Sequence, residues 1–144
     1  MIRHSGASAV VPVLTDSAAD PEILLIRQFR HAADGPIWEI PAGRLEPGEV
    51  PETCAARELT EETGQRAGRL DRLTTFYTTP GFTDERIHLF VARNLVQGEH
   101  RREADEFIET SRIPLSRAIA MIRAGEIVDG KTIVALLYFS QFGL

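Results

Sequence analysis

The stretch that decides the fold is residues 43–64, which read G-R-L-E-P-G-E-V-P-E-T-C-A-A-R-E-L-T-E-E-T-G. Within it, E-P-G-E at residues 46–49 places Pro and Gly at the centre of a tight turn. Pro51 is typical of the first position of a helix, and Gly64 is typical of the residue just past a helix end. The residues between them are good helix formers with no breaker. The sequence therefore predicts a turn followed by a helix over residues 51–63.

Three carboxylates lie on one face of this expected helix. Glu58, Glu61 and Glu62 stand at i, i+3 and i+4, so helical geometry brings them together. They repel one another, and the helix dipole disfavours anions near the C-terminal end. A hard divalent cation offsets both effects, because carboxylate oxygens are the ligands that Mg²⁺ and Mn²⁺ prefer. Arg57 is expected to orient Glu61, and Glu49 to turn in from the loop. Taken alone, the three carboxylates also fit a solvated acidic surface.

The whole segment is far more specific than its carboxylates. It resembles the Nudix box, G-x5-E-x7-R-E-U-x-E-E-x-G-U, where U is a bulky aliphatic residue. Seven matched identities arise by chance on the order of 10⁻⁸ per starting position. Leu59 fills the first U position, whereas the last holds Gln65, which we interpret as a packing change. The matching residues are Gly43, Glu49, Arg57, Glu58, Glu61, Glu62 and Gly64.

The rest of the chain predicts an α/β fold. Alternating or short apolar runs indicate strands, and strands and helices mix without a regular βαβ repeat, which indicates a sandwich with a mixed β-sheet. The order of elements resembles the Nudix-type α/β/α sandwich, in which the mixed sheet lies between helices, as a single Nudix hydrolase domain over residues 1–144. A final helix over residues 131–142 is apolar nearly all round, so we expect it to be buried. Residues 96–105 are expected to form a loop. The expected strands are Ala7–Leu14, Glu22–Phe29, Ile37–Ile40, Leu73–Tyr77, Arg86–Ala92 and Phe107–Ile113, and a further helix is expected over Pro114–Arg123.

The resemblance implies a metal-dependent pyrophosphohydrolase that uses Mg²⁺, with Mn²⁺ as a possible substitute. By position, the metal ligands are the Ala42 carbonyl, Glu58 and Glu62, with Glu61 sharing a further ion. The catalytic set also includes Arg57. The general base is implied to be a glutamate in the loop before the last strand, and there we favour Glu106 over Glu103. The acidic run around them equally fits a solvated loop.

A second resemblance narrows the substrate to one subfamily, the ADP-ribose pyrophosphatases. It rests first on Pro80, which lies fifteen residues after the Nudix box in T-P-G-F-T-D-E-R. The segments I-R-Q-F-R (26–30) and W-E-I-P-A-G (38–43) also resemble that subfamily. Without the box, the Pro80 loop is an ordinary turn. The subfamily hydrolyses ADP-ribose to AMP and ribose 5-phosphate. Arg30 matches a diphosphate-binding position, Phe29 and Glu39 are expected near the adenosine, and Glu85 near the terminal ribose. The remaining expected substrate-binding residues are Arg44, Pro80 and Gly81.

Composition excludes several other classes. The net charge of −5 argues against a large nucleic-acid footprint, and the apolar runs are too short to span a membrane. With no signal-peptide pattern at the N-terminus, a cytoplasmic protein is expected. Cys54 is the single cysteine and is expected to pack as a small hydrophobe on the helix.

Several alternatives stay open on the sequence. A homodimer is expected, but the first core strand begins near residue 7 and leaves no room for the N-terminal β-rich arm that many subfamily members exchange. Other substrates remain possible, namely another nucleoside diphosphate sugar, a dinucleotide polyphosphate or a nucleoside triphosphate. A non-catalytic nucleotide-binding module is a further alternative, and the intact carboxylate set argues against it.

Overall fold

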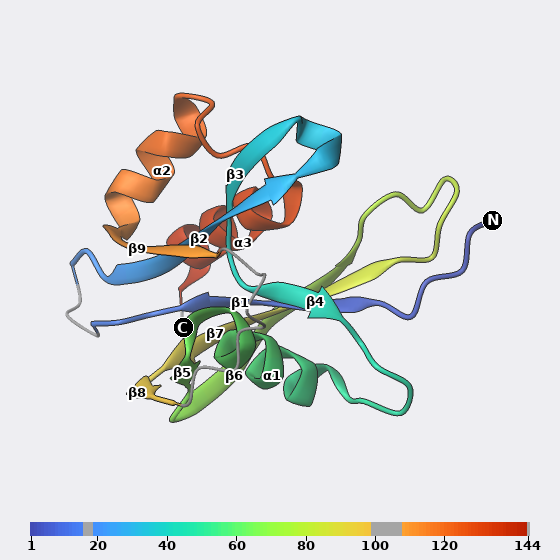
Figure 1. The fold of residues 1–144 in the computed structure, drawn as a ribbon, viewed down its shortest axis with the longest axis horizontal. Helices are drawn as coiled ribbons and strands as arrows, with labels where there is room; N and C mark the ends of the chain where they lie inside the picture. The colour runs from blue at the N-terminus through green and yellow to red at the C-terminus, as the bar shows by residue number, and fades with distance from the viewer. Residues whose placement is uncertain (16–18, 99–107, 144) are drawn as a thin grey trace.

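A computed structural model of the chain describes residues 1–15, 19–98 and 108–143. Its largest sheet has four strands in the order β4-β1-β7-β6 and is mixed, because β1 and β7 are parallel while the other pairs are antiparallel (Figure 1). The pairing joins the beginning of the chain to its middle, with Ala9 opposite Leu89. The strands are β1 (Ala7–Pro12), β4 (Ala42–Arg44), β6 (Arg69–Tyr77) and β7 (Arg86–Arg93).

A second, antiparallel sheet has the strand order β3-β2-β9. Its members are β2 (Glu22–Arg30), β3 (Gly35–Glu39) and β9 (Glu109–Pro114), and a short 3-10 turn, η1 (His31–Ala33), links β2 to β3. The two-residue strands β5 (Gln65–Arg66) and β8 (Val96–Gln97) form a separate pair. The end of β3 leads directly through Ile40 and Pro41 into β4, so one short segment joins the two larger sheets.

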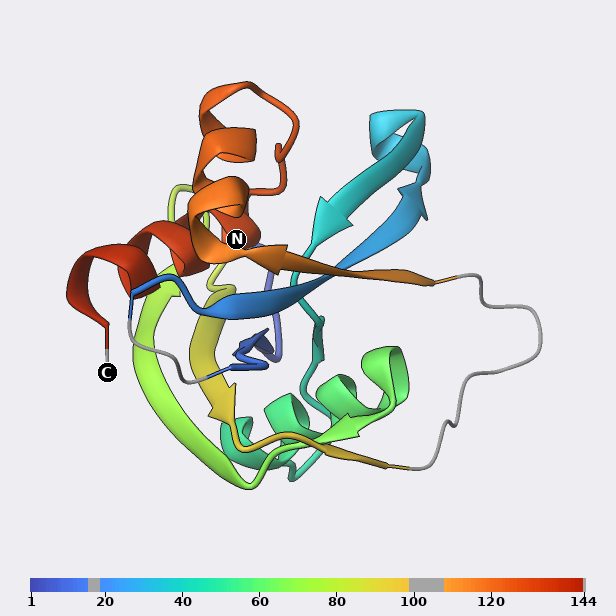
Figure 2. The same cartoon turned by 90° about the vertical axis from the view of Figure 1, so that its left-hand side faces the viewer.

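In the described part of the chain, three helices cover the sheets, namely α1 (Pro51–Thr63), α2 (Leu115–Arg123) and α3 (Gly130–Phe142). Side chains alternate across a strand, and β1 uses both of its faces. Val10 packs with residues of α1, whereas Ala9 and Val11 join a larger core that includes residues of α2 and α3. The mixed sheet therefore lies between α1 on one side and α3, α2 and the second sheet on the other (Figure 2).

The predicted α/β sandwich and its main elements are confirmed. Two local expectations were wrong, and the short strands β4 and β5 were not anticipated. Val96–Gln97 pairs as β8 where only a loop was expected. Helix α3 buries Ala135, Leu136 and Phe139 but leaves Val134, Leu137 and Phe142 exposed, so it is buried on one face only.

Two further findings concern single features. Cys54 is buried on α1, as expected. None of the helices in the described part of the chain is long and apolar enough to cross a membrane.

Candidate active site

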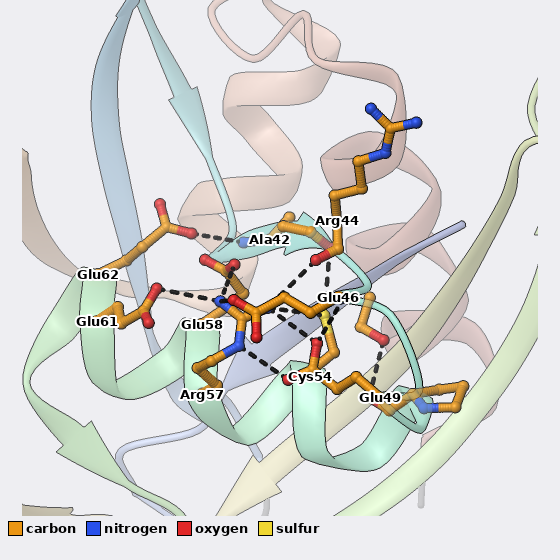
Figure 3. Close-up of polar contacts among 12 residues, drawn as sticks. Ala42, Arg44, Glu46, Glu49, Cys54, Arg57, Glu58, Glu61 and Glu62 are labelled. Carbon is orange, nitrogen blue, oxygen red and sulfur yellow. Dashed lines mark hydrogen bonds and ion pairs between the residues drawn. The ribbon is translucent and has the colours of Figure 1, made fainter. Parts of the chain in front are cut away.

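The end of α1 lies beside β4. The helix ends at Gly64, whose φ of 75° suits glycine and whose N–H donates to the Thr60 carbonyl at 2.9 Å. Pro41 is fixed against β1, because its carbonyl accepts the Val10 N–H at 3.0 Å. The next residue, Ala42, donates its N–H to Glu62 Oε1 at 2.9 Å. A carboxylate near the helix C-terminus is thereby tied to the start of β4 (Figure 3).

Gly43 allows β4 and α1 to approach each other closely. A Cβ atom at this position would overlap the carboxylate of Glu58. A side chain at the first glycine of the motif would therefore displace the carboxylate of Glu58, an expected metal ligand, from its place beside β4.

Arg57 holds the other carboxylates in place. Its Nε and Nη2 donate to the two oxygens of Glu49 at 2.9 and 3.0 Å, which is a bidentate pair. Its Nη1 donates to Glu58 at 2.8 Å and to Glu61 at 3.3 Å, which confirms that Arg57 contacts Glu61. Nη2 also reaches the Arg44 carbonyl at 3.2 Å, so the guanidinium joins α1 to the end of β4.

The electrostatics separate these carboxylates into two kinds. Hydrogen bonds from Arg57 and from the Glu46 backbone hold the pKa of Glu49 down to about 2. Burial, together with the adjacent Glu58, raises the pKa of Glu62 to about 8, although the hydrogen bond from the Ala42 N–H acts in the opposite direction. Burial also raises the pKa of Glu58 above its ordinary value. Glu49 is thus a stable structural anion, whereas Glu58 and Glu62 form a pair that favours either a proton or a cation.

The chemistry of this pair fits a hard divalent metal ion. Glu58, Glu62 and the Ala42 carbonyl supply oxygen donors only, which Mg²⁺ and Mn²⁺ prefer. Arg57 draws Glu49 and Glu61 toward itself (Figure 3). Within residues 1–15, 19–98 and 108–143, no three acidic, histidine or cysteine side chains converge into a complete metal site. The carboxyl pair together with the backbone carbonyl is accordingly the part of the arrangement that suits a cation.

A second charged cluster lies where β2, β3 and α3 meet. Arg30 donates from Nε and Nη2 to the two oxygens of Glu39 at 2.7 and 3.1 Å. Lys131 donates to the same carboxylate at 2.7 Å and to both oxygens of Asp129 at 3.0 Å. Glu39 is only 1% exposed. The structure therefore brings together Arg30 and Glu39. The family resemblance implies separate roles for them, in diphosphate and adenosine contacts.

The sequence offered no local signal for Lys131 and Asp129. Lys131 contacts Glu39 only through the tertiary fold, ninety-two residues later in the chain, and Asp129 in turn contacts Lys131. That Lys131 is the single lysine of the chain is a signal in hindsight, though composition alone gave it no role.

The loop that carries Pro80 joins β6 to β7 and contacts the N-terminal segment. Ile2 exchanges backbone hydrogen bonds with Phe82 and Asp84. Glu85 lies 3.2 Å from His4 Nε2 and accepts a hydrogen bond from Thr78 at 2.8 Å. Pro80 and Gly81 at the tip are exposed. The first residues of the chain therefore brace this loop.

The other expected site residues are distributed around these clusters. Phe29 is 55% exposed and meets the His31 ring edge-on at 5.0 Å. The Arg44 side chain points away from the carboxylates and donates to Ser5 at 3.0 Å (Figure 3). Glu103 and Glu106 lie outside the described residues.

Known proteins resemble this chain in sequence and in fold over most of its length. The model of the NUDIX domain matches residues 4–135. The chain is 44% identical over 140 residues to an ADP-ribose pyrophosphatase of Bacillus subtilis, with 96% of this chain and 74% of that protein covered. It is 40% identical over 153 residues to a GDP-mannose pyrophosphatase of Citrobacter koseri, with 99% of this chain and 76% of that protein covered. A crystal structure described as an ADP compounds hydrolase superposes with a TM-score of 0.83 at 22% identity, over 96% of this chain and 75% of that one, which supports the fold.

Proposed function

The chain belongs to the NUDIX domain family, as a Nudix pyrophosphohydrolase, and we propose that its substrate is ADP-ribose, which it cleaves to AMP and ribose 5-phosphate. The observation that carries the proposal is the carboxyl pair of Glu58 and Glu62 beside the backbone of Ala42. The identity with the Bacillus subtilis ADP-ribose pyrophosphatase supports the choice of substrate.

We propose Mg²⁺ as the cofactor, with Mn²⁺ as a substitute. When bound, the metal would neutralise the diphosphate and activate the attacking water. The residues of the chain that would hold it are Glu58, Glu62 and the Ala42 carbonyl, with Glu61 available for a further ion. Arg57 acts on these ligands by fixing Glu58 and Glu61 from the same helix.

The substrate diphosphate is proposed to bind Arg30. Its guanidinium uses Nε and Nη2 to hold Glu39, and its side chain is 44% exposed, so N–H donors remain for phosphate oxygens. Phe29 is 55% exposed, so its ring is accessible to the nucleobase, and it lies on the face of the β2–β3 ladder opposite to Arg30 and Glu39. The remaining contacts are assigned to Arg44, Pro80, Gly81 and Glu85.

We assign the general base to Glu106 or, next, Glu103. A carboxylate base is consistent with this chemistry because it accepts the proton of the attacking water. Single-turnover rates of Glu106→Gln and Glu103→Gln decide between them. A large loss in one variant identifies the base, and equal mild losses in both would exclude the pair.

A substrate panel tests the proposed function. Initial rates with Mg²⁺ are compared for ADP-ribose, ADP-glucose, GDP-mannose, dinucleotide polyphosphates and nucleoside triphosphates at equal concentrations. ADP-ribose is expected to have the highest kcat/KM and to yield AMP and ribose 5-phosphate. A strong preference for triphosphates would overturn the assignment of the Pro80 loop.

GDP-mannose is the second candidate, and one observation favours it. The Citrobacter koseri relative named for that activity is nearly as similar as the Bacillus subtilis protein. A higher kcat/KM for GDP-mannose than for ADP-ribose would select this alternative. Absence of turnover with every compound would instead favour a nucleotide-binding module.

The same proposal extends to assembly and compartment. Residues 1–144 are taken as one domain that works in the cytoplasm as a homodimer on a small-molecule substrate, without binding nucleic acid or a membrane. Sedimentation at micromolar concentration tests the oligomeric state, and a single species of 16.0 kDa would contradict a dimer.

A further inference from the structure

The direction of the Arg30 side chain is determined by Glu39. In the β2–β3 ladder Arg30 lies opposite Gly35, while Glu39 lies opposite Ile26. The two residues are therefore four positions apart along the sheet, roughly 13 Å at about 3.3 Å per residue. Their side chains meet because Arg30 extends back along the sheet surface to reach the carboxylate. This contact brings the guanidinium close enough to the carboxyl pair on α1 for the charge of Glu62 to raise the pKa of Arg30.

Glu39 depends on a second cation to occupy this position. Its side chain is only 2% exposed, and a buried carboxylate is costly unless it is paired and hydrogen-bonded. Burial raises its pKa, but the hydrogen bonds and charges of Arg30 and Lys131 outweigh that effect and leave the pKa below its ordinary value. Lys131 Nζ lies 2.7 Å from Glu39 Oε1, the same oxygen that Arg30 Nη2 contacts at 3.1 Å.

The N-terminus of α3 fixes Lys131 in turn. Asp129 is the N-cap residue and accepts hydrogen bonds from the Thr132 N–H at 3.2 Å and the Thr132 hydroxyl at 2.6 Å. Its carboxylate also accepts from Lys131. The Thr132 hydroxyl accepts the Ile40 N–H at 3.0 Å, which ties the same turn to the end of β3. The ammonium group is thus held between two carboxylates on elements that are bonded to each other.

We propose that Lys131 is a positioning residue for the hydrolytic reaction, which acts through Glu39 to hold the Arg30 guanidinium where the substrate diphosphate binds. Lys131 does not itself contact the substrate. A phosphate group pulls Arg30 away from Glu39, and Lys131 keeps the buried carboxylate charged and in place against that pull. The inference rests on the proposed function, because it requires a diphosphate substrate that Arg30 contacts.

The test compares Lys131→Met with a matched control at the other end of β2. Arg112 donates to Glu22 at 2.7 Å, so Arg112→Met also removes a cation from a glutamate of the same sheet, but at an exposed site. Lys131→Met is expected to lower kcat/KM for ADP-ribose about tenfold, mainly through KM, because a misplaced binding group loses substrate affinity. Lys131→Arg is expected to recover most of the loss, and Arg112→Met to leave kcat/KM unchanged.

A double-mutant cycle with Arg30→Met separates positioning from general stability. If Lys131 acts through Arg30, Lys131→Met causes no further loss in the Arg30→Met background. Equal losses in both backgrounds would overturn the proposal. If Lys131→Met unfolds below the assay temperature, Lys131→Gln, which keeps a donor for Glu39 without the charge, takes its place under the same criteria.

The outcomes distinguish this inference from the proposed function. A wild-type protein that hydrolyses no nucleoside diphosphate sugar would overturn the function and the inference together. An active wild type with an equally active Lys131→Met variant would overturn the inference alone.

Discussion

The two charged clusters of this chain are built in opposite ways. On α1 a single cation, Arg57, contacts the carboxylates of Glu49, Glu58 and Glu61, with Glu62 beside them. At the start of α3 a single buried carboxylate, Glu39, contacts two cations. The first cluster has four carboxylates for one guanidinium and keeps an excess of negative charge. The second cluster contains two cations, Arg30 and Lys131, and two carboxylates, Glu39 and Asp129, so its charges balance.

This difference in net charge indicates what each cluster is suited to do. An excess of buried negative charge is unfavourable unless a cation or a proton joins it. The cluster on α1 is therefore suited to bind a metal ion. A balanced cluster needs no further ligand and holds its members in fixed positions. We therefore propose that the α1 cluster performs the chemistry and that the α3 cluster orients Arg30 for binding the substrate.

The largest expected effect on kcat comes from substitutions in the buried carboxyl pair of the α1 cluster. Glu58→Gln and Glu62→Gln are each expected to lower kcat about 10²- to 10⁴-fold, because a neutral amide is a weak metal ligand, while the fold is retained. Steady-state rates and circular dichroism check this. Glu52→Gln on the same helix is the control, since Glu52 is exposed and pairs only with Arg72 among the described residues. Near wild-type rates in both variants would exclude the assigned site.

A smaller loss is expected when the central cation of the same cluster changes shape. Arg57→Lys keeps the charge but cannot make the bidentate contact with Glu49 while reaching Glu58 and Glu61. We expect kcat to fall about 10- to 100-fold, because misplaced ligands lose catalytic geometry. Arg72→Lys, at the exposed Glu52 pair, is the control. Equal rates for the two lysine variants would mean that Arg57 does not position the ligands.

The smallest effect is the pH dependence of stability without metal. Glu62, with a pKa of about 8 when folded and an ordinary value when unfolded, stabilises the fold only while protonated. Its contribution is complete below about pH 4.5 and is lost as the pH rises through about 8. Glu49 has the opposite sign, because its pKa of about 2 gives stability that disappears as the pH falls below about 4.5.

Thermal unfolding with a chelator measures the contribution of Glu62. The Tm of the wild type is expected to decline between pH 5 and pH 8, and Glu62→Gln is expected to flatten this decline. Added Mg²⁺ is expected to raise the Tm more at pH 8 than at pH 5.5, because metal binding requires the ionised carboxylate. A decline of the same slope in Glu62→Gln would show that another group causes it.

The α1 cluster was predictable from sequence because all of its members lie within one contiguous segment. A turn, a helix start and a helix end bracket Glu58 and Glu62, and helical spacing alone brings them together. The exact contact of Glu62 with the Ala42 N–H was not predictable, since it depends on the three-residue strand β4, which is too short to leave a periodic pattern.

The α3 cluster was only half predictable. The family resemblance predicts that Arg30 and Glu39 are site residues, but nothing in their neighbourhood indicates that they pair, because the contact follows from the register of β2 and β3. Lys131 belongs to an element that folds back onto that pair from far along the chain. Val134 and Leu137 are exposed although the whole helix was expected to be buried. The sequence of an apolar helix does not reveal which face the core will cover.

The central claim is that the α1 carboxyl pair hydrolyses a nucleoside diphosphate linkage with the help of a metal ion. Its most direct test is chromatographic measurement of AMP released from ADP-ribose by the purified wild type and by Glu62→Gln, with Mg²⁺ and with excess chelator. We expect AMP and ribose 5-phosphate in equal amounts from the wild type with Mg²⁺ only, and almost none from Glu62→Gln. Release that survives chelation, or that is equal in the two proteins, would contradict the claim.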